Sequence, residues 1–346
     1  MDHFQEGSGK APQRFSARVW TAAGIVALVV TLLWLVKATF SVLLLILAGA
    51  LIALYFRGLS GLLHRGLHLP EKGSLSIAIM GSLLLVAGFF WLAGNRITQQ
   101  ASQLSEILPS TVEKVKEELR KSPVGQHILQ KATSGRSMQK ASAVMKTFFR
   151  STFGVLGDVY VVLFLGIFFT VSPRTYIHGF LQLMPYTARP RAGDVVGKAG
   201  ATLTKWLKGK IFSMLVVAVL TVIGLLIIGV PMAFVLALIA GLLNFIPNFG
   251  PLIAMVPAVL VGFLKGPSTA LLVAGLYIGV QVLESNVITP QIQKRLINIP
   301  PALIIMAQLF MGVLTGGWGL VLATPLVAIL MVVVQELWVK QQNLKT

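Results

Sequence analysis

The sequence predicts an all-α, polytopic membrane protein with about eight transmembrane segments, two of them broken or re-entrant. The first observation is composition: the 346 residues are 55% hydrophobic and 12% charged, whereas soluble domains are about 25% charged. The second is that several apolar runs reach the roughly 20 residues that cross a bilayer core of about 30 Å. The third is that prolines and glycines interrupt two of these runs near their centres.

The first 94 residues contain a basic tail and three predicted spans. Residues 1–18 form the tail, and residues 19–94 hold the spans. The spans are Val19–Val36, Ala38–Phe56 and Ser74–Gly94. The first two runs meet at Lys37 with little chain between them, which predicts a tight hairpin with the lysine at the membrane interface.

Residues 95–150 are hydrophilic but periodic, which predicts an extramembrane amphipathic helical region. Five apolar residues fall on one helical stripe. They are Leu104, Leu108, Val112, Val115 and Leu119. A fourth span at residues 151–172 and a basic interfacial helical segment at residues 173–210 follow, and Trp206 beside lysines is typical of a membrane interface.

Residues 211–340 are predicted to be a transport core, with helix breaks near 247–251 and 316–319. Proline removes a backbone donor and clashes with the preceding turn, so a broken helix has free carbonyl groups that lipid cannot satisfy. Secondary transporters present such groups to a solute, which favours a transporter or channel over a merely kinked structural helix. Kinked spans and re-entrant hairpins both fit, and the charge rule slightly favours hairpins because they place Lys294 and Arg295 inside.

Glu284 and Asp158 are the two of eleven acidic residues that fall well within apolar spans. An ionised carboxylate at mid-bilayer costs a few kcal/mol, so such a group normally has a partner or a function. Glu284 is a candidate for proton or ion coupling, with a helix end at the interface as the alternative. Asp158 has two equal interpretations, ion coupling or a structural ion pair with Lys37 or another basic residue.

The candidate solute-binding residues are polar or helix-breaking and cluster at the breaks and in the span Ser268–Ile288. They are Asn244, Pro247, Asn248, Gly250, Pro251, Gln281, Glu284, Asn286 and Gln308. The amides can donate to and accept from the hydroxyl or carbonyl groups of a neutral polar solute. The alternative for the asparagines is that they cap the broken helix ends.

Other function classes receive no support. The net charge of +18 would suggest nucleic acid in a soluble protein, but the basic residues lie mostly between apolar runs, which indicates membrane topology and anionic lipid instead. Cysteine is absent, and the chain has no HExxH, GxSxG or phosphate-loop motif. We therefore expect no enzyme activity, no cofactor, no metal and no nucleic-acid partner. The charge rule predicts that both termini are cytoplasmic.

Four blocks resemble the autoinducer-2 exporter family, and the resemblance extends over most of the chain. They are GLLNFIPNFGPLIAMVPA at Gly241–Ala258, ESNVITPQI at Glu284–Ile292, IPPALIIM at Ile299–Met306 and GGWGLVLATPLVAIL at Gly316–Leu330. The resemblance implies eight membrane segments, a bacterial inner-membrane location and a homo-oligomer, plausibly a pentamer. It places Asn244, Pro247, Gly250 and Pro251 in a broken-helix site, with Glu284, Asn286 and Pro290 beside it. Many relatives carry Asp or another polar residue before the asparagine of the second block, where this chain has Glu284 and Ser285.

The resemblance implies two activities: export of autoinducer-2, a small hydroxylated signalling molecule, or exchange of sodium or lithium for protons. The expected function is export of such a solute, coupled to a proton at Glu284. Cation–proton exchange through Glu284 and Asp158 is the alternative. A structural or channel-like membrane oligomer, with residues 95–150 as its interaction surface, is the third hypothesis.

Overall fold

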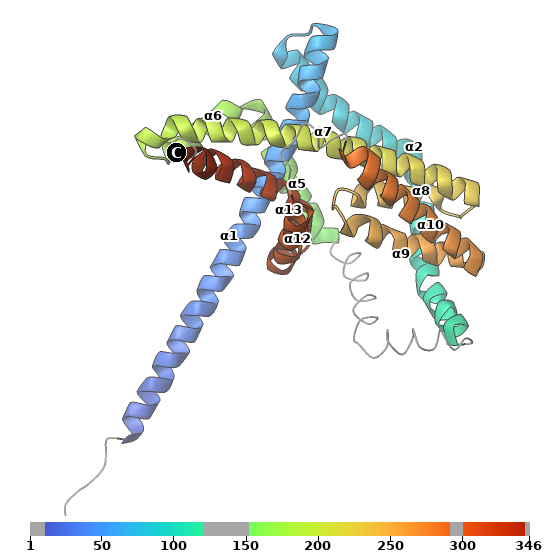
Figure 1. Cartoon of the computed structure of the whole chain (residues 1–346), viewed down its shortest axis with the longest axis horizontal. Helices are drawn as coiled ribbons and strands as arrows, with labels where there is room; N and C mark the ends of the chain where they lie inside the picture. The colour runs from blue at the N-terminus through green and yellow to red at the C-terminus, as the bar shows by residue number, and fades with distance from the viewer. Residues whose placement is uncertain (1–10, 121–151, 291–299, 343–346) are drawn as a thin grey trace, which may run out of the picture.

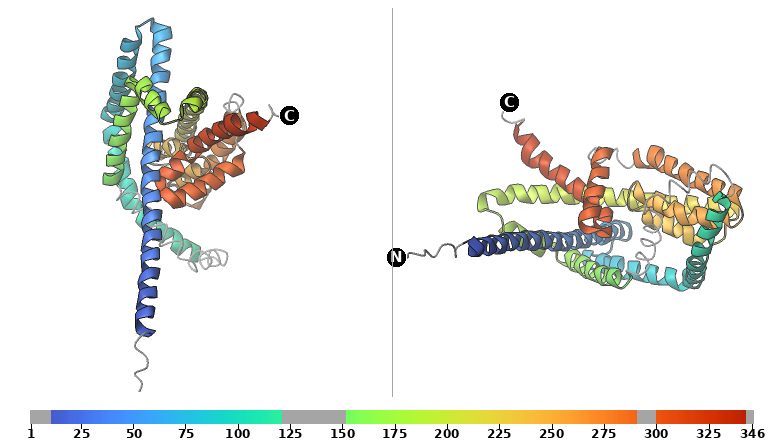
Figure 2. Two further views of the ribbon diagram at one scale, coloured as in Figure 1. Left: turned by 90° about the vertical axis from the view of Figure 1, so that its left-hand side faces the viewer. Right: turned by 90° about the horizontal axis from the view of Figure 1, so that it is seen from below.

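The computed structural model describes residues 11–120, 152–290 and 300–342, and these residues form helices and short connections without any strand. A long N-terminal helix projects from a body of packed helices (Figures 1 and 2). Within the described ranges, five helices are long and apolar enough to cross a membrane, or six if one bent pair counts as a span. The predicted class of all-α polytopic membrane protein is confirmed.

Helix α1 (Ala11–Leu67) is continuous over 57 residues, so the predicted hairpin at Lys37 is wrong. The physical reason is local: no glycine or proline lies at the junction, and lysine is a good helix former. At a rise of 1.5 Å per residue the helix is about 85 Å long, far more than one perpendicular crossing needs.

Helix α2 (Glu71–Arg120) joins the predicted third span to the start of the predicted amphipathic region without a break. The apolar stripe is partly packed, since Leu104 is buried against the body. Gln100 supports the same contact, because its side-chain oxygen accepts from the Val235 backbone N–H at 3.4 Å. Residues 121–150 of the predicted region lie outside the described residues.

Helix α5 (Thr152–Val171) coincides with the predicted fourth span. The chain then bends by 93° into α6 (Pro173–Gln182), where proline occupies the first helical turn. After the short turn η1 (Tyr186–Ala188), α7 (Arg189–Ile228) combines the basic segment and the predicted fifth span in one helix.

Trp206, which the sequence suggested for an interface, instead lies in the interior of the body. Its ring meets Phe245 edge-on, with centroids 5.5 Å apart and an interplanar angle of 84°. It belongs to a buried cluster with Leu44, Leu203 and Leu322, which ties α1 and α7 to the second broken segment.

The first broken segment is a hairpin of α8 (Ala233–Leu243) and α9 (Phe249–Phe263). Its two outer ends meet, because the Lys265 ammonium donates to the Gly229 carbonyl at 2.7 Å. The segment therefore leaves the body at the end where it entered, as a re-entrant hairpin does. Gly250 is essential to the turn: a Cβ there would collide with the carbonyl of Leu243.

The second broken segment, α12 (Pro301–Thr315) and α13 (Gly317–Val334), also folds back on itself. Gly316 makes the reversal with φ 68°. A Cβ at Gly319 would collide with the carbonyl of Met311, a contact that a continuous helix cannot make across eight residues. The last described elements are η3 (Gln335–Val339) and α14 (Lys340–Gln342).

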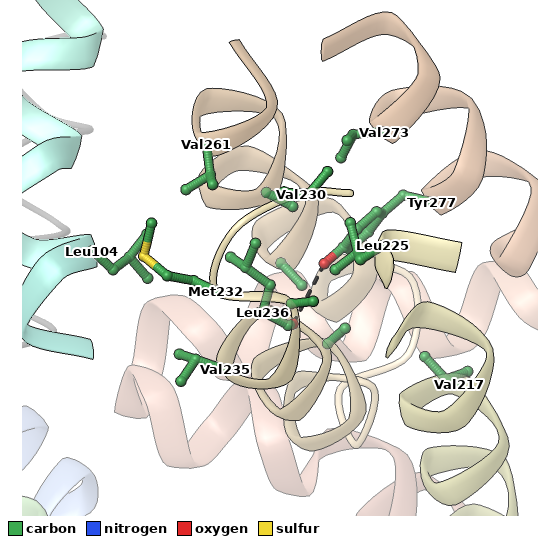
Figure 3. Close-up of a cluster of buried hydrophobic side chains, with 14 residues drawn as sticks. Leu104, Val217, Leu225, Val230, Met232, Val235, Leu236, Val261, Val273 and Tyr277 are labelled. Atoms are coloured by element: carbon green, nitrogen blue, oxygen red, sulfur yellow. Dashed lines mark hydrogen bonds between the residues drawn. The ribbon is translucent and has the colours of Figure 1, made fainter. Parts of the chain in front are cut away.

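Between the hairpins, α10 (Pro267–Leu283) continues into a π-helical turn η2 (Glu284–Ile288). Helices α7, α8, α9 and α10 share a buried apolar cluster that includes Leu225, Leu236, Val261 and Val273 (Figure 3). In lipid, such close packing and interhelical hydrogen bonds hold helices together, since lipid tails are as apolar as leucine. This rigid group of helices positions the polar residues described next.

Candidate functional site

A chain of four buried or nearly buried polar side chains lies where α7, the α8–α9 break and η2 meet. The Lys210 ammonium is 3.5 Å from Glu284 Oε1. Ser213 Oγ is 2.7 Å from the same carboxylate oxygen, and Asn244 Nδ2 is 3.0 Å from Ser213 Oγ. Side chains of Lys210 and Glu284 are only 11% and 7% exposed, so this ion pair is well removed from water.

Local helix geometry places each member of the chain. Lys210 and Ser213 are three residues apart and therefore share one face of α7. Asn244 is the C-terminal cap of α8, where the helix stops before Pro247. Glu284 begins the π-helical turn, a type of helix irregularity that is frequent at functional sites.

Gln308 connects the two broken segments. Its side-chain Nε2 donates to the carbonyl of Pro247 at 2.8 Å. Pro247 lies in the break of the first hairpin, and Gln308 lies on α12 of the second. The Pro247 carbonyl, which also accepts from the Phe249 backbone N–H at 2.8 Å, is thus satisfied by protein, as the absence of water in a membrane core requires.

Two amide oxygens next to this arrangement have no hydrogen-bond partner. They are Asn244 Oδ1 and Gln308 Oε1, and both side chains are fully buried. The described residues contain one more such buried oxygen, Thr324 Oγ1 on α13. An unpaired buried acceptor costs about 1–3 kcal/mol, so the two amide oxygens favour a ligand that supplies donors.

Three other predicted residues, Asn248, Pro251 and Gln281, line a separate open pocket of about 270 Å³ between α9 and α10. Its other lining residues are mainly apolar, and Tyr277 is among them. Asn248 adopts φ 67° and is exposed, so it points away from the buried chain. The predicted binding set is therefore divided between the buried chain and this pocket.

The remaining predicted residues have local partners. Gly250 makes the hairpin turn, and Asn286 is exposed and donates to the Val282 carbonyl of its own helix at 2.9 Å. Asp158 accepts from the Trp318 indole at 2.6 Å. That bond joins α5 to the start of α13, so Asp158 contacts the second break.

Sequence reasoning missed Lys210, Ser213 and Trp318. Lys210 ends a run of basic residues and was assigned to an interface, while Ser213 is a single small polar residue in an apolar run. The sequence does contain a signal for Lys210 and Ser213: they lie three residues apart at the start of a predicted span and therefore form one polar helix face. It contains no such signal for Trp318.

Hairpins that fold back in an apolar helical body, with a buried polar chain where α7, the first break and η2 meet, define a multi-pass membrane protein with a buried polar site. Comparison with known protein families identifies the family to which this membrane protein belongs. The model of the AI-2E family transporter matches residues 24–338, and the chain therefore belongs to this family of membrane transporters.

Individual relatives agree with this assignment. A provisionally named transport protein of Mycobacterium tuberculosis, MT0215, is 30% identical over 335 residues, which cover 91% of this chain and 88% of that protein. A provisionally named transport protein of Bacillus subtilis, YueF, is 28% identical over 183 residues, or 52% of this chain and 50% of its own length. The AI-2 transport protein TqsA of Escherichia coli is 26% identical over 183 residues, 52% of each chain. The chain thus spans about half the length of YueF and TqsA.

Proposed function

We propose that this protein is a secondary transporter that exports a small, neutral, hydroxylated signalling molecule of the autoinducer-2 type. The observation that carries the proposal is the pair of unpaired, fully buried amide oxygens, Asn244 Oδ1 and Gln308 Oε1. Hydroxyl groups of a solute would supply the missing donors. The name of the relative TqsA, an AI-2 transport protein, supports the choice of solute.

The charge at the site favours a neutral solute over a cation. A monovalent cation would bind carboxylate and amide oxygens, but the Lys210 ammonium already lies 3.5 Å from the Glu284 carboxylate. A second positive charge beside Lys210 would be repelled. Exchange of sodium or lithium for protons remains the second candidate, because Glu284, Ser213 and the two amide oxygens are all hard oxygen donors.

The transport cycle requires movement of the hairpins. Asn244 and Gln308 are fully buried in the described conformation, so a solute reaches them only when helices separate. The bond between Gln308 and the Pro247 carbonyl joins the two hairpins and would break as they part. We propose that Glu284 takes up the coupling proton, and that Asp158, held by Trp318, positions the second break instead.

We further propose a bacterial inner-membrane location with both termini cytoplasmic, and a homo-oligomer of five subunits. The family assignment and the basic segments between apolar runs support these expectations. Apolar side chains such as those of Val313 and Leu85 are exposed on the surface of the single chain, where lipid or neighbouring subunits would cover them.

The test measures autoinducer-2 inside and outside cells that lack their own exporter. Cells express wild type, Glu284→Gln or Glu336→Gln at matched membrane levels. Glu336 is a suitable control because its ion pairs with Lys198 and Lys340 lie on the surface, away from the buried chain. The proposal expects the wild type and the control to lower the internal pool, and Glu284→Gln to leave it high. An unchanged partition with all three proteins would refute autoinducer-2 as the solute.

A further inference from the structure

Hydrogen-bond direction in the buried chain is determined by Glu284. An ionised carboxylate can only accept, so the single proton of the Ser213 hydroxyl is donated to Glu284 Oε1. Ser213 Oγ must then accept from the Asn244 amide, which turns its Nδ2 towards the serine. The Asn244 Oδ1 atom consequently faces away from Ser213 and has no partner.

We propose that Ser213 is a positioning residue that transmits protonation of Glu284 to the amide of Asn244. A proton from water adds to the carboxylate oxygen facing Ser213, and the new O–H bond donates to Ser213 Oγ. The serine hydroxyl is then free to donate to Asn244. The amide turns over to present Oδ1 to the serine, and its Nδ2 takes the former place of the oxygen. One O–H bond of a hydronium ion breaks and one O–H bond forms at Glu284, and no other covalent bond changes.

This switch, which rests on the proposed function, makes solute binding and proton binding oppose each other. With Glu284 ionised, Asn244 offers an acceptor to a solute hydroxyl. With Glu284 protonated, the same position offers a donor, so the solute hydroxyl must turn over and accept, and it loses the hydrogen bond that it had donated to Oδ1. One hydrogen bond corresponds to about a three- to tenfold change in affinity. Proton entry would therefore promote solute release, as exchange of one for the other requires.

Few charged groups can interfere with this titration. Helices α8, α9, α10, α12 and α13 and the break at 244–248 carry no charged side chain. On α7, Lys210 faces Glu284, whereas Lys205 and Lys208 are exposed. Within the part of the chain that the structure describes, Glu284 is the acid of this site and Lys210 its paired cation.

The first experiment needs no solute. Infrared difference spectra between neutral and acidic pH are recorded on the full chain in phosphatidylethanolamine–phosphatidylglycerol vesicles, with and without ¹³C-labelled asparagine. The wild type should show a carboxyl band that Glu284→Gln removes and a shift of the asparagine band that Asn244→Leu removes. Ser213→Ala should keep the carboxyl band and lose the asparagine shift, and Ser213→Thr should restore it. Ser285→Ala, on the exposed side of η2, is the matched control and should behave as wild type.

The inference is overturned if the asparagine shift persists in Ser213→Ala, or if the wild type shows no Glu284-dependent band. A second measurement of autoinducer-2 affinity separates this inference from the proposed function. Affinity should fall about three- to tenfold on acidification in wild type and less than about twofold in Ser213→Ala. If the asparagine shift depends on Ser213 but autoinducer-2 does not bind, the switch is supported and autoinducer-2 is refuted as the substrate. If autoinducer-2 binds with the same pH dependence in wild type and Ser213→Ala, the switch is refuted.

Discussion

Removing one partner of the buried Lys210–Glu284 pair should destabilise the protein more than removing both. Two unit charges 3.5 Å apart attract with about 5 kcal/mol at an effective dielectric constant of 20. Lys210→Met leaves the carboxylate buried without its cation, and Glu284→Gln leaves the ammonium without its anion. Loss of one partner of a buried pair typically costs about 3–5 kcal/mol. The double variant leaves no uncompensated charge and should recover most of that loss.

The assay is thermal unfolding of detergent-solubilised protein, followed by tryptophan fluorescence in wild type, both single variants and the double variant. Lys208→Met is the control, because this exposed lysine lies on the same helix. It should unfold near the wild-type temperature, and each single variant should unfold well below it. The double variant should be more stable than either single variant. Additive losses in the double variant would contradict this prediction, because they would show that the two charges do not interact.

Three further predictions concern the backbone turns and the contacts between elements. Gly250→Ala should destabilise the first hairpin by about 1–3 kcal/mol through overpacking. Gly275→Ala is the control and should not destabilise the protein, because a Cβ at Gly275 meets open space. The measurement is the unfolding temperature of each variant. Trp318→Phe removes the indole donor to Asp158 and should lower the free energy of unfolding by about 1–3 kcal/mol. The same unfolding assay measures this loss, and an unchanged unfolding temperature would show that the hydrogen bond does not form. Lys265→Met breaks the hydrogen bond that joins the outer ends of the first hairpin and should speed proteolysis there, and an unchanged cleavage pattern would contradict that role.

Much of the fold follows from local signals in the sequence. An apolar run bounded by polar residues marks a span, which is why α5, at residues 152–171, lies within one residue of the predicted span at residues 151–172. Proline and glycine mark breaks, and both predicted breaks occur. Helix continuity is harder to predict, because a lysine such as Lys37 can mark the end of a span, yet its helix propensity and the absence of glycine or proline around it favour a continuous helix.

The site was only partly predictable, because periodicity assigns residues to a helix face but not to a partner. Glu284 and Asn244 stand out as polar residues in apolar surroundings, and both belong to the buried chain. Asn248 has the same sequence signal, yet its positive φ turns it towards another pocket. Ser213 is seventy-one positions from Glu284, so only the packing of α7 against η2 reveals it.

We propose that the solute binds at the buried polar chain where α7, the first break and η2 meet. Since the chain contains no cysteine, single cysteines can be introduced at Ser213, which lies beside Asn244, and, as a control, at exposed Asn286. The measurement is the rate of labelling by a small water-soluble thiol reagent, with and without autoinducer-2, in membrane vesicles. We expect the solute to slow labelling at position 213 and to leave the rate at position 286 unchanged. Equal rates with and without solute at position 213, in a variant that the reagent reaches, would show that the solute does not bind there.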